Sequence, residues 1–218
     1  MRKTSYAITF LLVAVALFLN VFAIQRPDWL IVKGSDIIHT RITVRYGLTE
    51  RCERTIIEIP GPSAGGKIAY TDYQCRAFPS SVTDRCEKGN RGFCTAWSSA
   101  GYLAEMSIIF GAVALLSLIF GVSTHSRRRR IWKAVAVLVT AHAAFIMAAW
   151  AIITDLWRTS SFWELQHAQP SFSYYVSLVS WIFSYAIVGG VIYTGVAADK
   201  GHRWAAGNRA YRIIEDRE

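Results

Sequence analysis

The sequence predicts a mostly α-helical membrane protein, a four-helix transmembrane bundle with a small disulfide-braced antiparallel β-sheet in its first outer loop. Hydrophobic residues make up 53% of the 218-residue chain, and they fall into four long blocks. Charged residues make up only 18%, below the roughly 25% of an average soluble domain. All four cysteines lie between the first two apolar blocks. These observations exclude a soluble globular domain and a disordered chain.

The first apolar block runs from Tyr6 to Ile24 and contains no charged residue. As a helix it is long enough for the roughly 30 Å hydrocarbon core of a bilayer. The residues Val21-Phe22-Ala23 resemble a signal-peptide cleavage site, but the apolar stretch exceeds the usual length of such a peptide. We therefore expect a retained transmembrane helix here and three more in the later blocks.

The short segments between the blocks predict the orientation. The loop 157–171 contains one basic residue, Arg158, whereas the turn between the second and third blocks contains four consecutive arginines. By the positive-inside rule, this turn and both termini are expected in the cytoplasm. We expect the plasma membrane as the location of the protein. The same arginines are a candidate site for anionic lipid headgroups, and they are Arg127, Arg128, Arg129 and Arg130.

The positive charge of the chain follows this organisation. Lys and Arg number 24 against 15 Asp and Glu, a net charge of +9, and the excess lies at the ends of the apolar blocks. We therefore expect membrane lipids, and no nucleic acid, as the partners of these cations. The expected parts are the N-terminus with the first span (1–24), the first outer loop (25–102), the second span (103–122), the basic turn (123–130), the third span (131–156), the second outer loop (157–171), the fourth span (172–196) and the cytoplasmic tail (197–218).

The cysteines predict two disulfides, because an even number confined to one outer loop is typical of an oxidising compartment. No C-x-x-C pair occurs, so we expect neither a metal site nor a cofactor. Three pairings are possible for the four residues. These residues are Cys52, Cys75, Cys86 and Cys94.

Strand-like patterns favour one pairing. Apolar and polar residues alternate from Ile38 to Arg45, and two further β-prone runs flank the turn-forming segment 60–66. If these two runs form a hairpin with Ile59 opposite Ile68, Cys52 lies opposite Cys75. We therefore predict the pairs Cys52–Cys75 and Cys86–Cys94.

This first outer loop resembles that of the superfamily of claudins and peripheral myelin proteins. Trp29 follows the first span, and Gly47-Leu48-Thr49-Glu50-Arg51-Cys52 precedes a second cysteine, Cys75, on the next predicted strand. The family carries a W…G-L-W-x-x-C…C motif in this loop. The resemblance implies a left-handed four-helix bundle topped by a small antiparallel sheet with one cross-strand disulfide.

The sequence also departs from the family pattern. Thr49 stands where the motif has its middle tryptophan, the second cysteine comes later, and Cys86 and Cys94 are additional. The chain is therefore more similar to the divergent claudin-like membrane proteins of fungi than to junction-forming animal claudins. Trp29, Gly47 and Leu48 are interpreted as residues of the fold, and no pore or junction residue is transferred.

Small residues at four-residue spacing predict close helix packing in the third and fourth spans. These faces serve either the bundle itself or another membrane protein. His142, the one titratable residue near the middle of a span, is interpreted as a hydrogen-bonding residue between helices. The small-residue faces contain Ala136, Thr140, Ala144 and Ala148 in the third span, and Ser180, Ser184 and Gly190 in the fourth.

The chain lacks the motifs of catalysis. It has no phosphate-binding loop, no G-x-S-x-G and no H-E-x-x-H, and no proline interrupts a span as in many transporters. We therefore expect a non-catalytic accessory or organising subunit that binds a larger integral-membrane protein by lateral helix packing. A channel, a transporter or a cell-surface polysaccharide synthase would be such a partner. The alternative is a self-associating adhesion or barrier protein of the claudin type.

Overall fold

The computed structural model of the chain describes residues 3–34, 40–60, 67–87, 89–123, 128–159 and 162–206. It divides into two compact units. The helical unit comprises residues 1–21, 105–147 and 178–218, and the sheet unit comprises residues 22–104 and 148–177. Each of the four long helices contributes residues to both units.

The four helices are α1 (Lys3–Gln25), α2 (Arg91–Ser123), α3 (Arg128–Arg158) and α4 (Phe172–Asp199). Each is long and apolar enough to cross a membrane, as expected from the four apolar blocks. Helix α2 begins well before the expected start of its span at Leu103. Its first turns bury Phe93, Cys94 and Trp97 at three- and four-residue spacing, which extends the helix beyond the uniformly apolar block.

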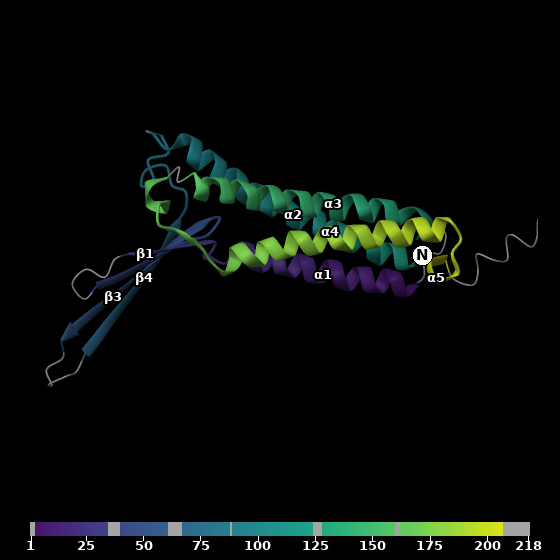
Figure 1. The fold of residues 1–218 in the computed structure, drawn as a ribbon, viewed down its shortest axis with the longest axis horizontal. Coiled ribbons are helices and arrows are strands. Elements are labelled where there is room, and N and C mark those ends of the chain that lie inside the picture. The colour runs from purple at the N-terminus through teal and green to yellow at the C-terminus, as the bar shows by residue number, and fades with distance from the viewer. Residues whose placement is uncertain are drawn as a thin grey trace, which may run out of the picture. The chain divides into compact units, whose positions relative to one another are not determined.

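In the helical unit, each helix contacts the next in chain order, and α4 returns to α1. The Asn20 side-chain amide donates to the Ser107 hydroxyl, which joins α1 to α2. The Ser180 hydroxyl donates to the carbonyl oxygen of Ala16 at 3.2 Å, which joins α4 to α1. Figure 1 shows α1 and α4 side by side in this unit. The core between the helices consists mainly of alanine, valine, leucine and isoleucine side chains.

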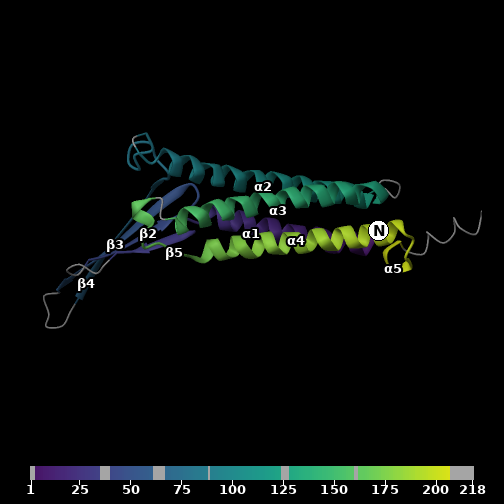
Figure 2. The same cartoon turned by 45° about the horizontal axis from the view of Figure 1, so that its top comes forward.

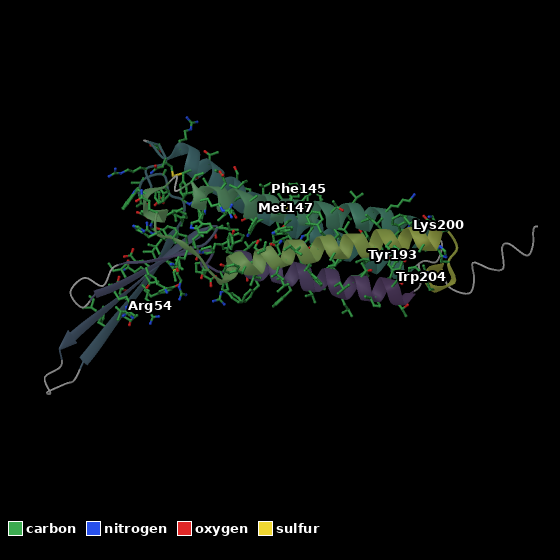
Figure 3. The ribbon with its side chains drawn as sticks, viewed as in Figure 1. Arg54, Phe145, Met147, Tyr193, Lys200 and Trp204 are labelled. Atoms are coloured by element: carbon green, nitrogen blue, oxygen red, sulfur yellow. A yellow bond between two sulfur atoms is a disulfide. The ribbon has the colours of Figure 1, made fainter. Side chains whose placement is uncertain are left out.

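The chain turns sharply where α4 ends. Gly201 adopts a positive φ of 80°, the left-handed conformation that commonly terminates helices. The short helix α5 (Arg203–Ala206) follows, and its Trp204 ring stacks on Tyr193 of α4 with centroids 5.6 Å apart. The two rings lie next to each other in Figure 3. Residues 207–218, the larger part of the tail expected at 197–218, lie outside the described residues.

The sheet unit contains a five-stranded antiparallel sheet in the order β4-β3-β2-β1-β5, whose strands are visible in Figure 2. Ile59 pairs with Ile68 and Cys52 pairs with Cys75, as the predicted hairpin required. The expected strand at 38–45 begins at Thr40 in the structure, and Ile38 and His39 lie outside the described residues. The strands are β1 (Leu30–Lys33), β2 (Thr40–Tyr46), β3 (Glu50–Pro60), β4 (Lys67–Ala77) and β5 (Gln169–Pro170).

Both predicted disulfides are confirmed. Cys52 is bonded to Cys75 across β3 and β4, and Cys86 is bonded to Cys94 at the start of α2. The first bridge joins residues 23 positions apart, and the second joins residues 8 apart. The first bridge thus closes the longer loop of the unfolded chain.

Removing the Cys52–Cys75 bridge should destabilise the sheet unit more than removing Cys86–Cys94. Loop-closure entropy gives a loss of about 3 kcal/mol for the longer loop and about 2.5 kcal/mol for the shorter. The free energy of unfolding of the paired Cys→Ser variants in detergent, followed by the intrinsic tryptophan fluorescence of the chain, would measure the two losses. Equal stability of the wild type and both variants would contradict this expectation.

Candidate functional site

The base of the sheet is held by five packed aromatic rings, called here the aromatic base. The Phe78 centroid lies 5.1 Å from that of Tyr46 and 5.2 Å from that of Trp97, and Phe93 stacks on Phe162 at 4.6 Å. The aromatic base therefore joins β2, the segment after β4, the start of α2 and the second loop. Its members are Tyr46, Phe78, Phe93, Trp97 and Phe162.

The three motif residues interpreted as residues of the fold are all buried in the sheet unit. Trp29 is completely buried, and its indole N–H donates to the carbonyl oxygen of Ala23 at 2.8 Å. Leu48 lies in the same apolar core. Gly47 leaves no room for a side chain, because a Cβ there would approach the Pro27 Cα to 2.7 Å. These contacts are a hydrogen bond to the backbone and close packing, so we interpret these positions as parts of the scaffold.

Ion pairs join the sheet to two loops. Glu164 belongs to the short helix η1 (Trp163–Leu165), and its carboxylate accepts a hydrogen bond from the Tyr46 hydroxyl and pairs with Arg51, both at 2.7 Å. Burial and the bond to Glu164 raise the pKa of Tyr46 well above its ordinary value. Glu164 thereby ties the second loop to β2 and β3. Glu164 was not predicted from the sequence, because no local sequence pattern relates it to Tyr46.

Asp84 forms the second ionic contact. Its carboxylate accepts two hydrogen bonds from Arg76, at 2.5 and 2.8 Å, and one from the backbone N–H of Ser80 at 2.7 Å. Burial raises the pKa of the Asp84 carboxyl, but the bonds from Arg76 and Ser80 outweigh burial and hold this pKa below its ordinary value of 3.8. The ionised Asp84 carboxylate therefore holds the segment after β4 against Arg76 of that strand.

The Asp84 contact predicts an acid-sensitive sheet unit. Because the pKa is lower in the folded state, its contribution is complete above about pH 4 and is lost as the pH falls further. Asp84→Asn should cost about 2 kcal/mol of unfolding free energy at neutral pH and flatten the acid limb of the stability curve. Urea unfolding from pH 3 to pH 7 would measure both effects. If the unfolding free energy falls equally steeply with decreasing pH in the wild type and in Asp84→Asn, the assignment is contradicted.

A buried polar cluster lies in the helical unit. His142 on α3 is 1% exposed, and its Nδ1 lies 2.7 Å from the carbonyl oxygen of Ser107 on α2. A carbonyl only accepts, so Nδ1 carries the proton in this bond. The interpretation of His142 as a hydrogen-bonding residue between helices is confirmed. Asn20 of α1 is the third member of this cluster, because its side-chain amide donates to the Ser107 hydroxyl. Its role was not predicted from the sequence.

The structure distributes the predicted small-residue faces between core and surface. On α3, Ala136 is buried, Ala144 and Ala148 are half-buried, and Thr140 is exposed. On α4, Ser180 and Ser184 are completely buried, whereas Gly190 is exposed. Thr140 and Ser184 each donate their hydroxyl to the carbonyl oxygen four residues earlier. Thus Ala136 and the two serines pack inside the protein, and Gly190 faces outward.

Gly190 lines an apolar groove of about 280 Å³ between α1 and α4, called here the lateral groove. Its lining residues recur every three or four positions on both helices, so it follows one face of each. The Thr9 and Thr194 hydroxyls in its wall donate to the carbonyl oxygens of Ser5 and Gly190 of their own helices. The full lining is Ser5, Ile8, Thr9, Leu12, Phe183, Ala186, Ile187, Gly190, Val191 and Thr194.

The glycines of α4 differ in what surrounds them. A Cβ on Gly195 would lie 2.5 Å from the indole ring of Trp132 on α3, so this glycine permits the close contact between α3 and α4. A Cβ on Gly189 or Gly190 would meet nothing within 4 Å. Packing within the described structure therefore explains Gly195 but neither of the other two.

Gly195→Ala should destabilise the helical unit, whereas Gly190→Ala should not. Overpacking against Trp132 costs about 1–3 kcal/mol, and alanine in a free helical position is favoured over glycine by up to about 1 kcal/mol. Thermal unfolding of both variants in the same detergent, followed by circular dichroism, would compare them. Loss of stability in Gly190→Ala would show that an unseen contact covers this position.

The remaining candidate positions offer little coordination chemistry. Arg127 lies outside the described residues, and Arg128, Arg129 and Arg130 begin α3 with side chains that are also outside the described part, so lipid-headgroup binding stays a prediction. Among the described residues, one group could offer three metal ligands, namely Glu50, Cys52 and Cys75. Both sulfurs belong to the disulfide, which leaves the Glu50 carboxylate as the sole anionic ligand.

No protein-family model matches the chain, and a search of curated proteins finds no match.

Proposed function

We propose that this chain is a non-catalytic, claudin-like accessory or organising subunit of a larger integral-membrane complex. It binds a transmembrane helix of its partner in the lateral groove between α1 and α4. Channels, transporters and cell-surface polysaccharide synthases are partners of this kind. The observation that carries the proposal is the exposed, apolar groove that Gly190 lines.

The shape of the groove fits a third helix. The α4 residues that line it extend from Phe183 to Thr194, about 16 Å along the helix axis. Small residues at such a surface let a second backbone approach closely, which is the main source of helix association in lipid. No contact among the described residues requires glycine at position 190. Close packing of a partner helix at this position would require it.

The polar groups of the groove support an apolar occupant. The hydroxyls of Thr9 and Thr194 are used within their own helices, so they need no partner from outside. Wide apolar surface on Ile8 and Leu12 continues the groove on the α1 side. An apolar transmembrane helix buries this surface without competing for the hydroxyls of Thr9 and Thr194.

The disulfides support the proposed orientation. Bridges persist in oxidising compartments, which supports a sheet on the non-cytoplasmic side of the membrane. With both termini in the cytoplasm, we propose the plasma membrane as the site of action. The basic turn before α3 agrees with this orientation. In the proposed orientation, the disulfide-braced sheet faces the outer side of the membrane.

Gly190→Leu should abolish co-purification with the partner, while Gly189→Leu should leave it intact. Both glycines are exposed neighbours on α4 with free space around a Cβ, but only Gly190 lines the lateral groove. The measurement is crosslinking in intact membranes, followed by mild detergent extraction and quantitative mass spectrometry of captured membrane proteins. Unchanged thermal stability of both variants would show that neither effect comes from unfolding.

Three results would contradict the proposal. A wild-type protein that is always captured alone as a monomer has no partner. Capture that Gly190→Leu and Gly189→Leu reduce equally does not use the groove. Capture of further copies of this chain alone would favour the self-associating adhesion or barrier protein.

A further inference from the structure

The two faces of the sheet differ in charge. Paired residues of an antiparallel sheet point to the same side, so the register assigns every described strand residue to a face. One face directs Leu30, Val44 and Tyr46 into the apolar core. The other is called here the basic sheet face and contains Lys33, Thr43, Arg45, Arg54 and Tyr73.

The cations of the basic sheet face surround one hydroxyl. Thr43 pairs with Lys33 on β1 and with Arg54 on β3, and Arg45 is its neighbour two positions along β2 on the same face. Adjacent strands lie about 4.8 Å apart, and diagonal neighbours lie about 7–8 Å apart. Three positive side chains therefore lie on three sides of Thr43, and Arg41, two positions before it on β2, lies on the fourth. Figure 3 shows Arg54 on the sheet.

The described residues provide no ion-pair partner for Lys33, Arg45 or Arg54. The arginines on the opposite face differ in this respect. There, Arg51 and Arg76 line a hollow of about 220 Å³, and acids from two loops neutralise both. The register also places two acidic residues of β3, Glu50 and Glu58, on the basic sheet face, but neither stands opposite Lys33, Arg45 or Arg54. Clustered like charges repel each other, so an external anion would stabilise this face.

Tyr73 extends the row of residues. It pairs with Arg54 and is 53% exposed, so its ring lies at the end of the line Lys33–Thr43–Arg54–Tyr73 across four strands. This line is about 14 Å long at the usual strand spacing. An exposed aromatic ring beside guanidinium, ammonium and hydroxyl groups is suited to a ligand with both apolar ring faces and negative charge.

We propose that the basic sheet face binds an acidic polysaccharide. One carboxylate or sulfate group lies over Thr43, held by Lys33, Arg45 and Arg54, and a neighbouring sugar ring packs on Tyr73. The open row across four strands suits an extended polymer, and the aromatic ring favours a sugar chain over a purely ionic partner. This site lies in the sheet unit, and its test does not depend on the lateral groove.

The test uses the full chain in detergent and two acidic polymers, polygalacturonate and dextran sulfate, with neutral dextran for comparison. Arg45→Gln with Arg54→Gln should raise the Kd for the acidic polymers about tenfold. The control Arg91→Gln with Arg158→Gln removes the same charge from exposed positions of the sheet unit outside the strands, and should change the Kd less than about twofold. Surface binding measured at low and high salt gives these values.

A second pair of variants tests the sugar contact. Tyr73→Phe keeps the ring and should bind as the wild type does, whereas Tyr73→Ser should weaken binding about threefold or more. Intact disulfides in a non-reducing peptide map and an unchanged circular dichroism spectrum would show that each variant folds.

Four results would overturn the proposal. The first is equal loss of affinity in the two double variants, which would indicate nonspecific attraction. The second is wild-type affinity in Arg45→Gln with Arg54→Gln. The third is tighter binding of poly-glutamate than of the acidic sugars, which would indicate an acidic protein. The fourth is preferential binding to phosphatidylserine vesicles, which would indicate lipid headgroups.

Discussion

The pairing of β3 with β4 is the constraint on which the sheet unit depends. With Cys52 opposite Cys75, every residue of the hairpin is assigned to one face. A slip of one residue would exchange the two faces and separate the cysteines. The same register brings Arg51 and Arg76 to one side, where Glu164 and Asp84 reach them, and leaves Arg54 on the other. The pairing of β3 with β4, braced by one covalent bond, thus maintains the charge pattern of this hairpin.

The helical unit depends on a different constraint, because lipid gives helices no hydrophobic reason to associate. Its helices meet through close contacts such as Gly195 against Trp132 and through bonds such as His142 to Ser107. These contacts occupy the inward surfaces. The lateral groove is outward and mainly apolar, and its two threonine hydroxyls bond within their own helices, so another apolar helix would pack well in it.

The two proposals assign separate tasks to the two units. The helical unit presents apolar surface for a partner within the membrane, and the sheet unit presents charge outside it. A protein that recruits or organises a polysaccharide-handling complex would use both. Neither task requires a catalytic group.

The sequence alone determined the four helices, the hairpin register and both disulfides, because each depends on a local pattern of apolar residues, turn residues or cysteine positions. Only the tertiary structure decided which arginines are neutralised. Glu164 meets Arg51 from more than a hundred residues away, and no spacing rule relates them. It also decided that Gly195 is enclosed and Gly190 is open, because two glycines of one helix look alike until the neighbouring helices are in place.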